Sequence, residues 1–286
     1  MNSGRPDRVD VAAGRVRIAG ISVRYLDAGD AAAPVTLLLH GGTGSAERHW
    51  ALTIPWLVEA GYRCVAPDLR GHAGTTNDRD SLDQELMAGD AAALLEALGV
   101  RSAHLVGFSV GGVVALYLAL ARPDLVTSVT TIGSHMVVDD DVRASNATID
   151  PDRVLAESPR WATALRVLHG PAADPDEPGV AARDPEHWRR VCGWLIETWG
   201  RQPDWIDADL ARIACPTLVA RGGDDARASA RQQDRMVEAI PRARAFTLEG
   251  EGHFFLQDPA AVGRLCRVLV DFLDHAGTGP GTTGLG

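Results

Sequence analysis

Lysine is absent from this sequence: all 28 basic residues of the 286-residue chain are arginine. The absence excludes mechanisms that need a lysine amine, namely Walker A phosphate binding, ATP positioning in protein kinases, Schiff-base chemistry and Ser-Lys dyads. The abundance of Ala, Arg, Asp and Gly indicates codon bias in a GC-rich genome as its origin. The missing lysine therefore narrows the chemistry without indicating a function.

Cysteine is scarce, and its four copies lie far apart, at Cys64, Cys192, Cys215 and Cys266. They form no C-x-x-C pair of the kind that binds zinc or exchanges disulfides. No cluster of His, Cys and carboxylate groups has the spacing of a metal site either. We therefore expect a protein that uses no metal.

Long apolar runs are also missing. No stretch of about 18 apolar residues occurs, so no transmembrane helix is expected. Residues 1–20 lack the apolar centre of a signal peptide. The net charge of −10 and the absence of any Arg run longer than Arg189-Arg190 argue against nucleic acid, because phosphate binding needs clustered cations. We expect a cytoplasmic protein with a small-molecule substrate and no membrane partner; the oligomeric state stays open.

Short apolar runs recur along the chain and predict the strands of a mostly parallel sheet, since such runs suit strands that are covered on both faces. Before them, Arg15–Ile18 and Ile21–Leu26 alternate in polarity around Ala19-Gly20, which predicts a hairpin. The apolar runs are Val35–Leu39, Cys64–Pro67, His104–Phe108, Val126–Ile132, Thr217–Ala220 and Ala245–Leu248.

Helical stretches alternate with these runs, and this alternation favours a doubly wound α/β fold. Residues 134–210 break the alternation: they hold five of the seven Trp, Pro-rich turns and short helical patterns, which predict a helical cap. The expected organisation is a core at 1–133 and 211–275, a cap at 134–210 and a flexible tail at 276–286. The predicted core helices are Trp50–Ala60, Ser81–Leu98, Val110–Ala121, Ala228–Ala239 and Pro259–His275.

A nucleophile-elbow pattern, G-x-S-x-G, occurs once as Gly107-Phe108-Ser109-Val110-Gly111. It lies where the predicted strand ends and the helix Val110–Ala121 begins. Small residues two positions before and after Ser109 let the backbone turn sharply, which leaves the hydroxyl exposed. A purely structural Gly-Ser turn is the alternative interpretation.

A nucleophilic serine needs a base, and the base needs an orienting carboxylate. The loop after the run ending at Ala220 offers Asp224 and Asp225, and the loop after Leu248 offers His253. Both loops leave the carboxyl ends of predicted strands, the functional edge of an open α/β sheet. The order Ser, acid, His is the one expected with this elbow.

In this order and at these spacings, the motifs resemble the α/β-hydrolase superfamily, specifically its capped branch of esterases, lactonases, C–C hydrolases and epoxide-hydrolase-like enzymes. The resemblance runs from about Arg15 to Asp274 and includes the turns His40-Gly41-Gly42 and Asp68–His72. It implies an α/β-hydrolase fold: a mostly parallel central sheet, helices on both faces and an inserted helical cap.

The resemblance also implies a catalytic acid. The family's acid corresponds to Asp225, with the adjacent Asp224 as a rival. Some members take the acid from the loop after the preceding strand, which here would be Asp139, Asp140 or Asp141.

The oxyanion hole implied by the resemblance consists of the backbone N–H groups of Val110 and Gly42, with Thr43 as an alternative to Gly42. Two departures from the family pattern matter. Ser109 stands where alkyl-enzyme-forming members carry Asp, which argues against dehalogenase and epoxide hydrolase chemistry. The usual Gly-His-Gly-x-Ser loop is Gly71–Thr75 with Ala73 at its centre, which leaves its part in the pocket floor open.

The sequence thus predicts a serine hydrolase without metal or cofactor that cleaves a carboxylic ester or lactone of a bulky apolar small molecule through an acyl-enzyme. The cap should cover the pocket, with Trp161, Trp188 and Trp194 as candidate substrate contacts, although each could equally pack inside the cap. One alternative is C–C bond hydrolysis of a β-diketone-type substrate by the same triad. Another, of a different class, is a ligand-binding or receptor-type protein of this fold with little turnover.

Overall fold

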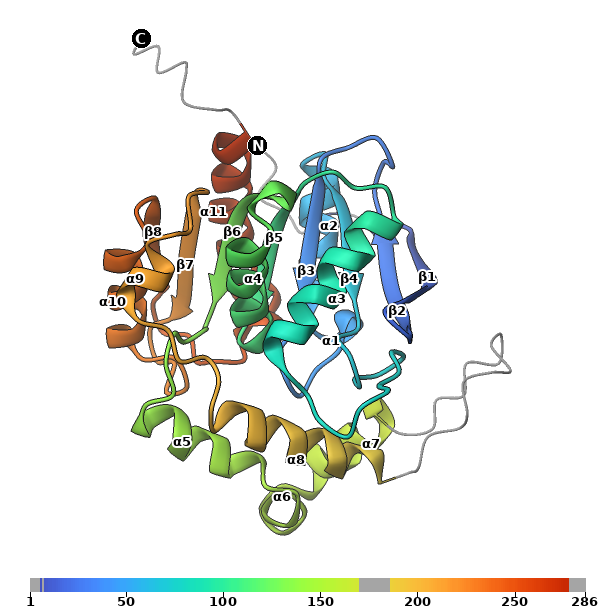
Figure 1. Cartoon of the computed structure of the whole chain (residues 1–286), viewed down its shortest axis with the longest axis vertical. Helices are drawn as coiled ribbons and strands as arrows, with labels where there is room; N and C mark the ends of the chain where they lie inside the picture. The colour runs from blue at the N-terminus through green and yellow to red at the C-terminus, as the bar shows by residue number, and fades with distance from the viewer. Residues whose placement is uncertain (1–5, 7, 170–185, 278–286) are drawn as a thin grey trace.

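An eight-stranded sheet organises the chain in the computed structural model, which describes residues 6, 8–169 and 186–277 (Figure 1). The strands are β1 (Val11–Ile18), β2 (Ile21–Ala28), β3 (Val35–Leu39), β4 (Arg63–Pro67), β5 (Ala103–Phe108), β6 (Val126–Ile132), β7 (Thr217–Gly222) and β8 (Ala243–Leu248). Their order across the sheet is β1-β2-β4-β3-β5-β6-β7-β8. β2 pairs antiparallel with β1 and β4, and every later pairing is parallel. The predicted hairpin and fold class are confirmed.

Helices cover both faces of this sheet. α3 (Gln84–Ala97) and α4 (Val110–Ala121) share one apolar cluster with one face of the sheet. A second cluster, on the other face, includes α1 (Ala46–Trp50), α2 (Ile54–Glu59) and α11 (Pro259–Gly277). The run Leu37-Leu38-Leu39 shows why the strands read as continuously apolar: Leu37 and Leu39 face the first cluster, Leu38 faces the second, and all are fully buried. The helices of the core are α1 (Ala46–Trp50), α2 (Ile54–Glu59), α3 (Gln84–Ala97), α4 (Val110–Ala121), α10 (Ala230–Ala239) and α11 (Pro259–Gly277), with the 3₁₀ turns η1 (Pro123–Leu125) and η3 (Phe255–Gln257).

The single helix predicted over Trp50–Ala60 is wrong, because the chain forms α1 and α2 there instead. Pro55 lies in the first turn of α2, where its missing N–H costs nothing. In the middle of one longer helix, the same ring would clash with the preceding turn and remove a hydrogen bond. Pro55 therefore explains why the helix is interrupted between α1 and α2.

A helical insertion, residues 133–216, connects β6 to β7. Figure 1 shows its helices within residues 140–169 and 187–199 across the carboxyl ends of the strands. Its described residues contain no strand, only an isolated bridge between Val137 and Asp204. Residues 170–185 of the predicted cap and 278–286 of the predicted tail lie outside the described residues. The insertion contains α5 (Asp140–Asn146), η2 (Ala147–Ile149), α6 (Pro151–Glu157), α7 (Pro159–His169), α8 (His187–Trp199) and α9 (Asp207–Leu210).

Among the helices of the described ranges, none combines the length and the hydropathy that crossing a membrane would need.

A buried ion pair ties the loop after β4 to α3. The Arg70 side chain is only 1% exposed, and its Nε and Nη2 donate to the two carboxylate oxygens of Asp90 at 2.7 and 2.6 Å. Nη1 donates to Asp78. Losing one member of a buried pair leaves the other charge uncompensated in the interior, which destabilises far more than losing an exposed pair.

We expect Arg70→Met to lower the free energy of unfolding by about 3–5 kcal/mol, because Asp90 then stays buried without its cation. Chemical denaturation at neutral pH measures this change. Arg153→Met is the control: it removes an exposed pair with Glu157 and should cost less than about 1 kcal/mol. Equal losses of unfolding free energy in the two variants would contradict the conclusion that the Arg70–Asp90 pair stabilises the fold more than an exposed pair does.

The core also contains a buried neutral histidine, His104 on β5. Its side chain lies on the face of the sheet that packs against the second cluster, and its Nδ1 is 2.8 Å from Ser128 Oγ. Burial lowers its pKa to about 4, and the more distant Asp274 opposes this shift. In the unfolded chain a histidine titrates near pH 6.5, so the unfolded state takes up this proton first as the pH falls.

The stabilising contribution of neutral His104 is therefore complete above about pH 6.5 and is lost between about pH 6.5 and 4. We expect the free energy of unfolding to fall over this window, and to fall by about 1–2 kcal/mol less at pH 5 in His104→Phe. Denaturation curves from pH 7 to 5 measure both slopes, and His275→Phe, on an exposed histidine, serves as the control. A His104→Phe profile parallel to that of the wild type would refute the attribution.

Candidate active site

Ser109 lies in a sharp turn between β5 and α4. Its backbone has φ of +52° and ψ of −117°, a conformation that costs a non-glycine residue on the order of 1–3 kcal/mol. A Cβ at Gly107 would collide with the carbonyl of Gly111, and a Cβ at Gly111 would collide with the carbonyl of Leu39. The two glycines of the motif are therefore required by the close approach of β5, α4 and β3, and the turn lifts Ser109 into a cavity.

His253 and Asp225 meet beside this turn, brought there by the loops after β8 and β7. His253 Nδ1 lies 2.8 Å from Asp225 Oδ2, and both side chains are buried. Asp225 Oδ1 accepts the backbone N–H groups of Arg227 and Ala228 at 2.8 and 2.9 Å. The carboxylate is thus fixed from both sides, with one oxygen aimed at the imidazole.

The rival acids lie elsewhere. Asp224 is exposed to solvent, although it is adjacent to Asp225 in sequence. Asp139 accepts hydrogen bonds from the Val142 N–H and from Gln232, and Asp140 is an exposed partner of Arg143. The side chain of Asp141 lies outside the described residues.

Of the two residues predicted to supply oxyanion donors, Gly42 lines the cavity and Val110 directly follows Ser109. Val110 is the first residue of α4, where an N–H has no carbonyl partner within the helix. Gly42 and Thr43, in the loop after β3, line the same cavity as Ser109. A Cβ at Gly42 would overlap the Trp199 ring, so only glycine permits this close packing against α8.

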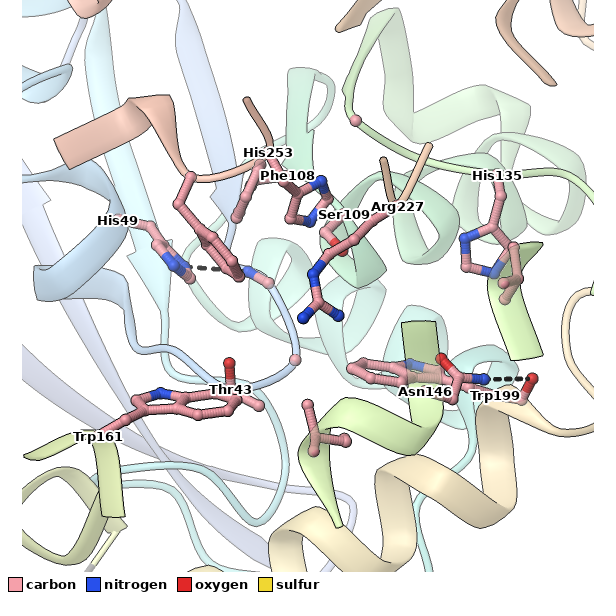
Figure 2. A pocket seen from close by; sticks show the side chains of 16 residues that line it. Thr43, His49, Phe108, Ser109, His135, Asn146, Trp161, Trp199, Arg227 and His253 are labelled. Atoms are coloured by element: carbon pink, nitrogen blue, oxygen red, sulfur yellow. Dashed lines mark hydrogen bonds between the residues drawn. The ribbon is translucent and has the colours of Figure 1, made fainter. Parts of the chain in front are cut away.

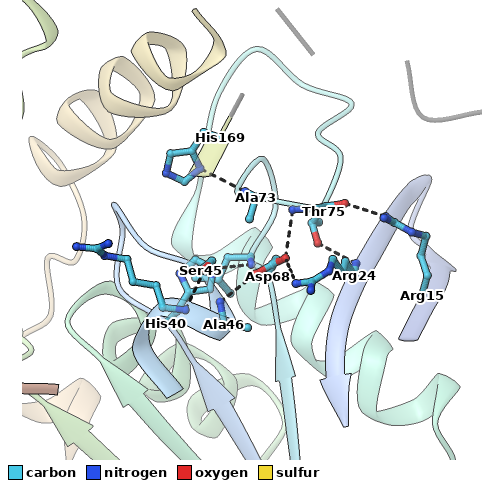
Figure 3. A network of polar contacts seen from close by, with 12 residues as sticks. Arg15, Arg24, His40, Ser45, Ala46, Asp68, Ala73, Thr75 and His169 are labelled. Carbon is cyan, nitrogen blue, oxygen red and sulfur yellow. Dashed lines mark hydrogen bonds and ion pairs between the residues drawn. The ribbon is translucent and has the colours of Figure 1, made fainter. Parts of the chain in front are cut away.

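A buried carboxylate holds the loops after β3 and β4 together (Figure 3). Asp68 Oδ1 accepts the N–H of Ala46 at 2.9 Å, and Oδ2 accepts Arg24 Nη1 at 3.0 Å and the N–H of Gly74 at 3.1 Å. His40 Nε2 accepts the N–H of Leu69 at 2.8 Å. Burial lowers the pKa of His40, which keeps that nitrogen available as an acceptor. These contacts set the position of Gly42 indirectly.

The unusual loop around Ala73 contacts the insertion. Ala73 has a positive φ of 38°, where glycine is favoured, and its N–H donates to His169 on α7 at 3.2 Å (Figure 3). His187 on α8 lies with Nε2 3.0 Å from the Gly71 carbonyl oxygen. His72 Nε2 lies 2.5 Å from the Gly42 carbonyl oxygen. The loop therefore connects the insertion with the Gly42 turn.

A cavity lies above Ser109, between the sheet edge and the insertion (Figure 2). A more open hollow adjoins it and shares Thr43, His49, Trp161, Arg227 and Phe254, which provides access from solvent. The cavity is lined by Gly41, Gly42, Thr43, His49, Phe108, Ser109, Gly133, His135, Val142, Asn146, Ile149, Trp161, Trp199, Arg227, His253 and Phe254.

Of the three tryptophans singled out from the sequence, the structure places Trp161 at the cavity (Figure 2). Trp188 is fully buried inside the insertion against Val154, and Trp194 donates to Asp80 at 3.3 Å. Trp199 lines the cavity but was not singled out, and no sequence signal separates it from Trp188.

Arg227 and His135 also line the cavity without having been predicted. Arg227 follows Asp225 by two residues, and this proximity is the one signal that could have indicated it. His135 follows β6 closely, but an isolated histidine carries no motif.

Comparison with known proteins identifies the family. A model of the alpha/beta hydrolase family matches residues 36–265. The provisionally named carbamate hydrolase RutD of Pseudomonas savastanoi pv. phaseolicola is 29% identical over 256 residues, which cover 83% of this chain and 93% of that protein. The bifunctional esterase/perhydrolase DCH of Acinetobacter calcoaceticus is 37% identical over 224 residues, 72% of this chain and 79% of that protein.

Among solved structures, the 2-hydroxy-6-oxo-6-phenylhexa-2,4-dienoate hydrolase of Rhodococcus sp. strain RHA1 has a TM-score of 0.72 at 21% identity, over 93% of this chain and all of that one (100%). This likeness concerns the fold. The match to the family model also covers the loops of the candidate site. It begins in β3, ends in α11 and includes Ser109, Asp225 and His253. The chain therefore belongs to the alpha/beta hydrolase family.

Proposed function

We propose that this hydrolase is a serine enzyme that cleaves a carboxylic ester or lactone of a bulky apolar small molecule through an acyl-enzyme on Ser109. The observation that carries the proposal is the hydrogen bond between His253 and the buried Asp225, at the cavity that Ser109 lines. A serine on a strained turn, a histidine and a satisfied carboxylate are the parts that nucleophilic acyl transfer needs.

In the proposed mechanism, Ser109 Oγ attacks the substrate carbonyl while His253 Nε2 takes the serine proton. Asp225 accepts the Nδ1 hydrogen, which fixes the tautomer and stabilises the imidazolium. His253 then gives the proton to the departing alcohol oxygen. Water attacks the acyl-enzyme with His253 as base, and the carboxylic acid leaves.

The negative charge that develops on the carbonyl oxygen is assigned to the N–H groups of Val110 and Gly42. Such donors are already oriented before the reaction, so each contributes on the order of 10²–10³ in rate. The chain thus supplies every group of the mechanism itself, and we propose a small-molecule substrate as its partner, with neither metal nor cofactor.

The lining of the cavity supports a bulky apolar substrate. Phe108, Trp161, Trp199 and Phe254 contribute aromatic surface, and such pockets bind ligands mainly by apolar burial. The Acinetobacter relative is named an esterase, which favours ester cleavage among the acyl transfers that this site could perform.

A fluorophosphonate probe tests the nucleophile. We expect it to label Ser109 in the wild type, to leave Ser109→Ala unlabelled, and to react at least about 10³-fold more slowly with His253→Ala, since the base is gone. Peptide mass spectrometry locates the label and its time course gives the rate. The exposed Ser102→Ala is the control and should react like the wild type. Labelling that persists in Ser109→Ala would refute the proposal.

Two adjacent aspartates provide a matched test of the acid. Asp225→Ala should lower kcat for a 4-nitrophenyl ester by about 10³–10⁴, because the imidazole loses the group that orients it. Asp224→Ala removes the same charge one residue away and should leave kcat nearly unchanged, because Asp224 faces solvent. A larger effect at Asp224, or equal effects at both, would overturn the assignment.

A further inference from the structure

A guanidinium group lies in the cavity beside Ser109 (Figure 2). Arg227 Nη2 donates to Thr148 Oγ1 at 2.7 Å, and its Cζ lies 5.4 Å from the centre of the Phe254 ring. Thr148 belongs to the insertion and Phe254 to the loop of the catalytic histidine. These contacts hold the side chain across the cavity, and its guanidinium points from beside Ser109 toward the insertion (Figure 2).

The surroundings of Arg227 favour a negatively charged ligand group. Burial lowers the pKa of Arg227 and Asp225 opposes this shift, but an arginine stays charged at physiological pH. Both oxygens of Asp225 are engaged, one by two backbone N–H groups and the other by His253. The carboxylate of Asp225 therefore serves the histidine, and the half-buried guanidinium is stabilised further by any carboxylate that enters the cavity.

His135 supplies a second polar group on the wall of the cavity. The residue is 7% exposed, and in the described part of the chain its buried Nε2 has no hydrogen-bond partner. Burial lowers its pKa to about 4, so the ring is neutral at neutral pH and can donate one N–H without adding a charge. A buried nitrogen without a partner destabilises the protein unless a bound molecule satisfies it.

We propose that this side of the cavity binds a carboxylate carried by the substrate, with Arg227 as its charge partner and His135 as a further hydrogen-bond donor. The inference rests on the proposed function, because the same molecule presents its ester or lactone carbonyl to Ser109. The substrate class becomes a half-ester or a lactone acid whose apolar part lies against Trp161 and Trp199. An arginine suits this task because its planar fork matches the two carboxylate oxygens.

The competing explanation is that Arg227 only holds the insertion in place through its hydrogen bond to Thr148. With such a structural role, replacing Arg227 would change the affinity for all ligands alike, whereas a carboxylate subsite discriminates by ligand charge. Two ligands that differ by one methyl group separate the explanations: benzyl hydrogen glutarate, which carries a free carboxylate, and benzyl methyl glutarate, which is neutral.

Calorimetric binding to the Ser109→Ala protein tests the subsite without turnover. We expect benzyl hydrogen glutarate to bind about 10–100-fold more tightly than benzyl methyl glutarate, the factor of one charge-assisted contact. In Ser109→Ala/Arg227→Met the two affinities should become nearly equal, whereas Arg227→Lys should retain part of the preference. Arg231→Met, which removes an exposed cation on α10, should retain all of it.

Equal affinities for the two ligands in Ser109→Ala, no binding of either, or a preference that survives Arg227→Met would each overturn the subsite. Turnover by the wild type separates this outcome from failure of the proposed function. Hydrolysis of both esters with equal kcat/KM would leave the function standing and refute the subsite. A binding preference for the charged ligand in Ser109→Ala, without hydrolysis of either ester by the wild type, would support the subsite and refute the proposed function.

Discussion

The backbone strain at Ser109 is the constraint around which the site is arranged. A positive φ at a serine persists only because β3, β5 and α4 approach so closely that Gly107 and Gly111 admit no side chain. The same turn starts α4 at Val110, so one strained residue presents the proposed nucleophile and, directly after it, an N–H at a helix N-terminus. A change in the backbone conformation of Ser109 would therefore displace both groups at once.

The remaining groups reach Ser109 because parallel strands end at one edge of the sheet. Asp225 follows β7 and His253 follows β8, and their hydrogen bond joins two loops that are 28 residues apart in sequence. On the other side of Ser109, the hydrogen bonds of Asp68 join the loops after β3 and β4. Rigid loops on both sides suit electrostatic catalysis, because donors that need no reorganisation stabilise a developing charge best.

Much of this arrangement is visible in the sequence, because local patterns encode it: apolar runs give the strands, and the Ser109 motif gives the turn. The insertion is different. Along α8, Trp199 lies on the stripe with Val191 and Leu195 that faces the main core, whereas Trp188 points into the insertion's own core. The helical periodicity of the sequence predicts two apolar faces on this helix. It does not predict which face contacts the cavity, because the packing of the helix against the core decides that. Arg227 and His135 escape prediction for the same reason, and Asp224 differs from Asp225 only in which side chain the folded loop buries.

The proposed mechanism requires Ser109, Val110 and Gly42 to act together on one carbonyl carbon and its oxygen. A crystal structure of the protein after reaction with a fluorophosphonate tests this requirement, because the adduct imitates the tetrahedral intermediate. We predict phosphorus bonded to Ser109 Oγ, and a phosphoryl oxygen about 2.7–3.1 Å from the backbone nitrogens of both Val110 and Gly42. A phosphoryl oxygen that points to solvent, or an adduct on any other residue, would contradict the account.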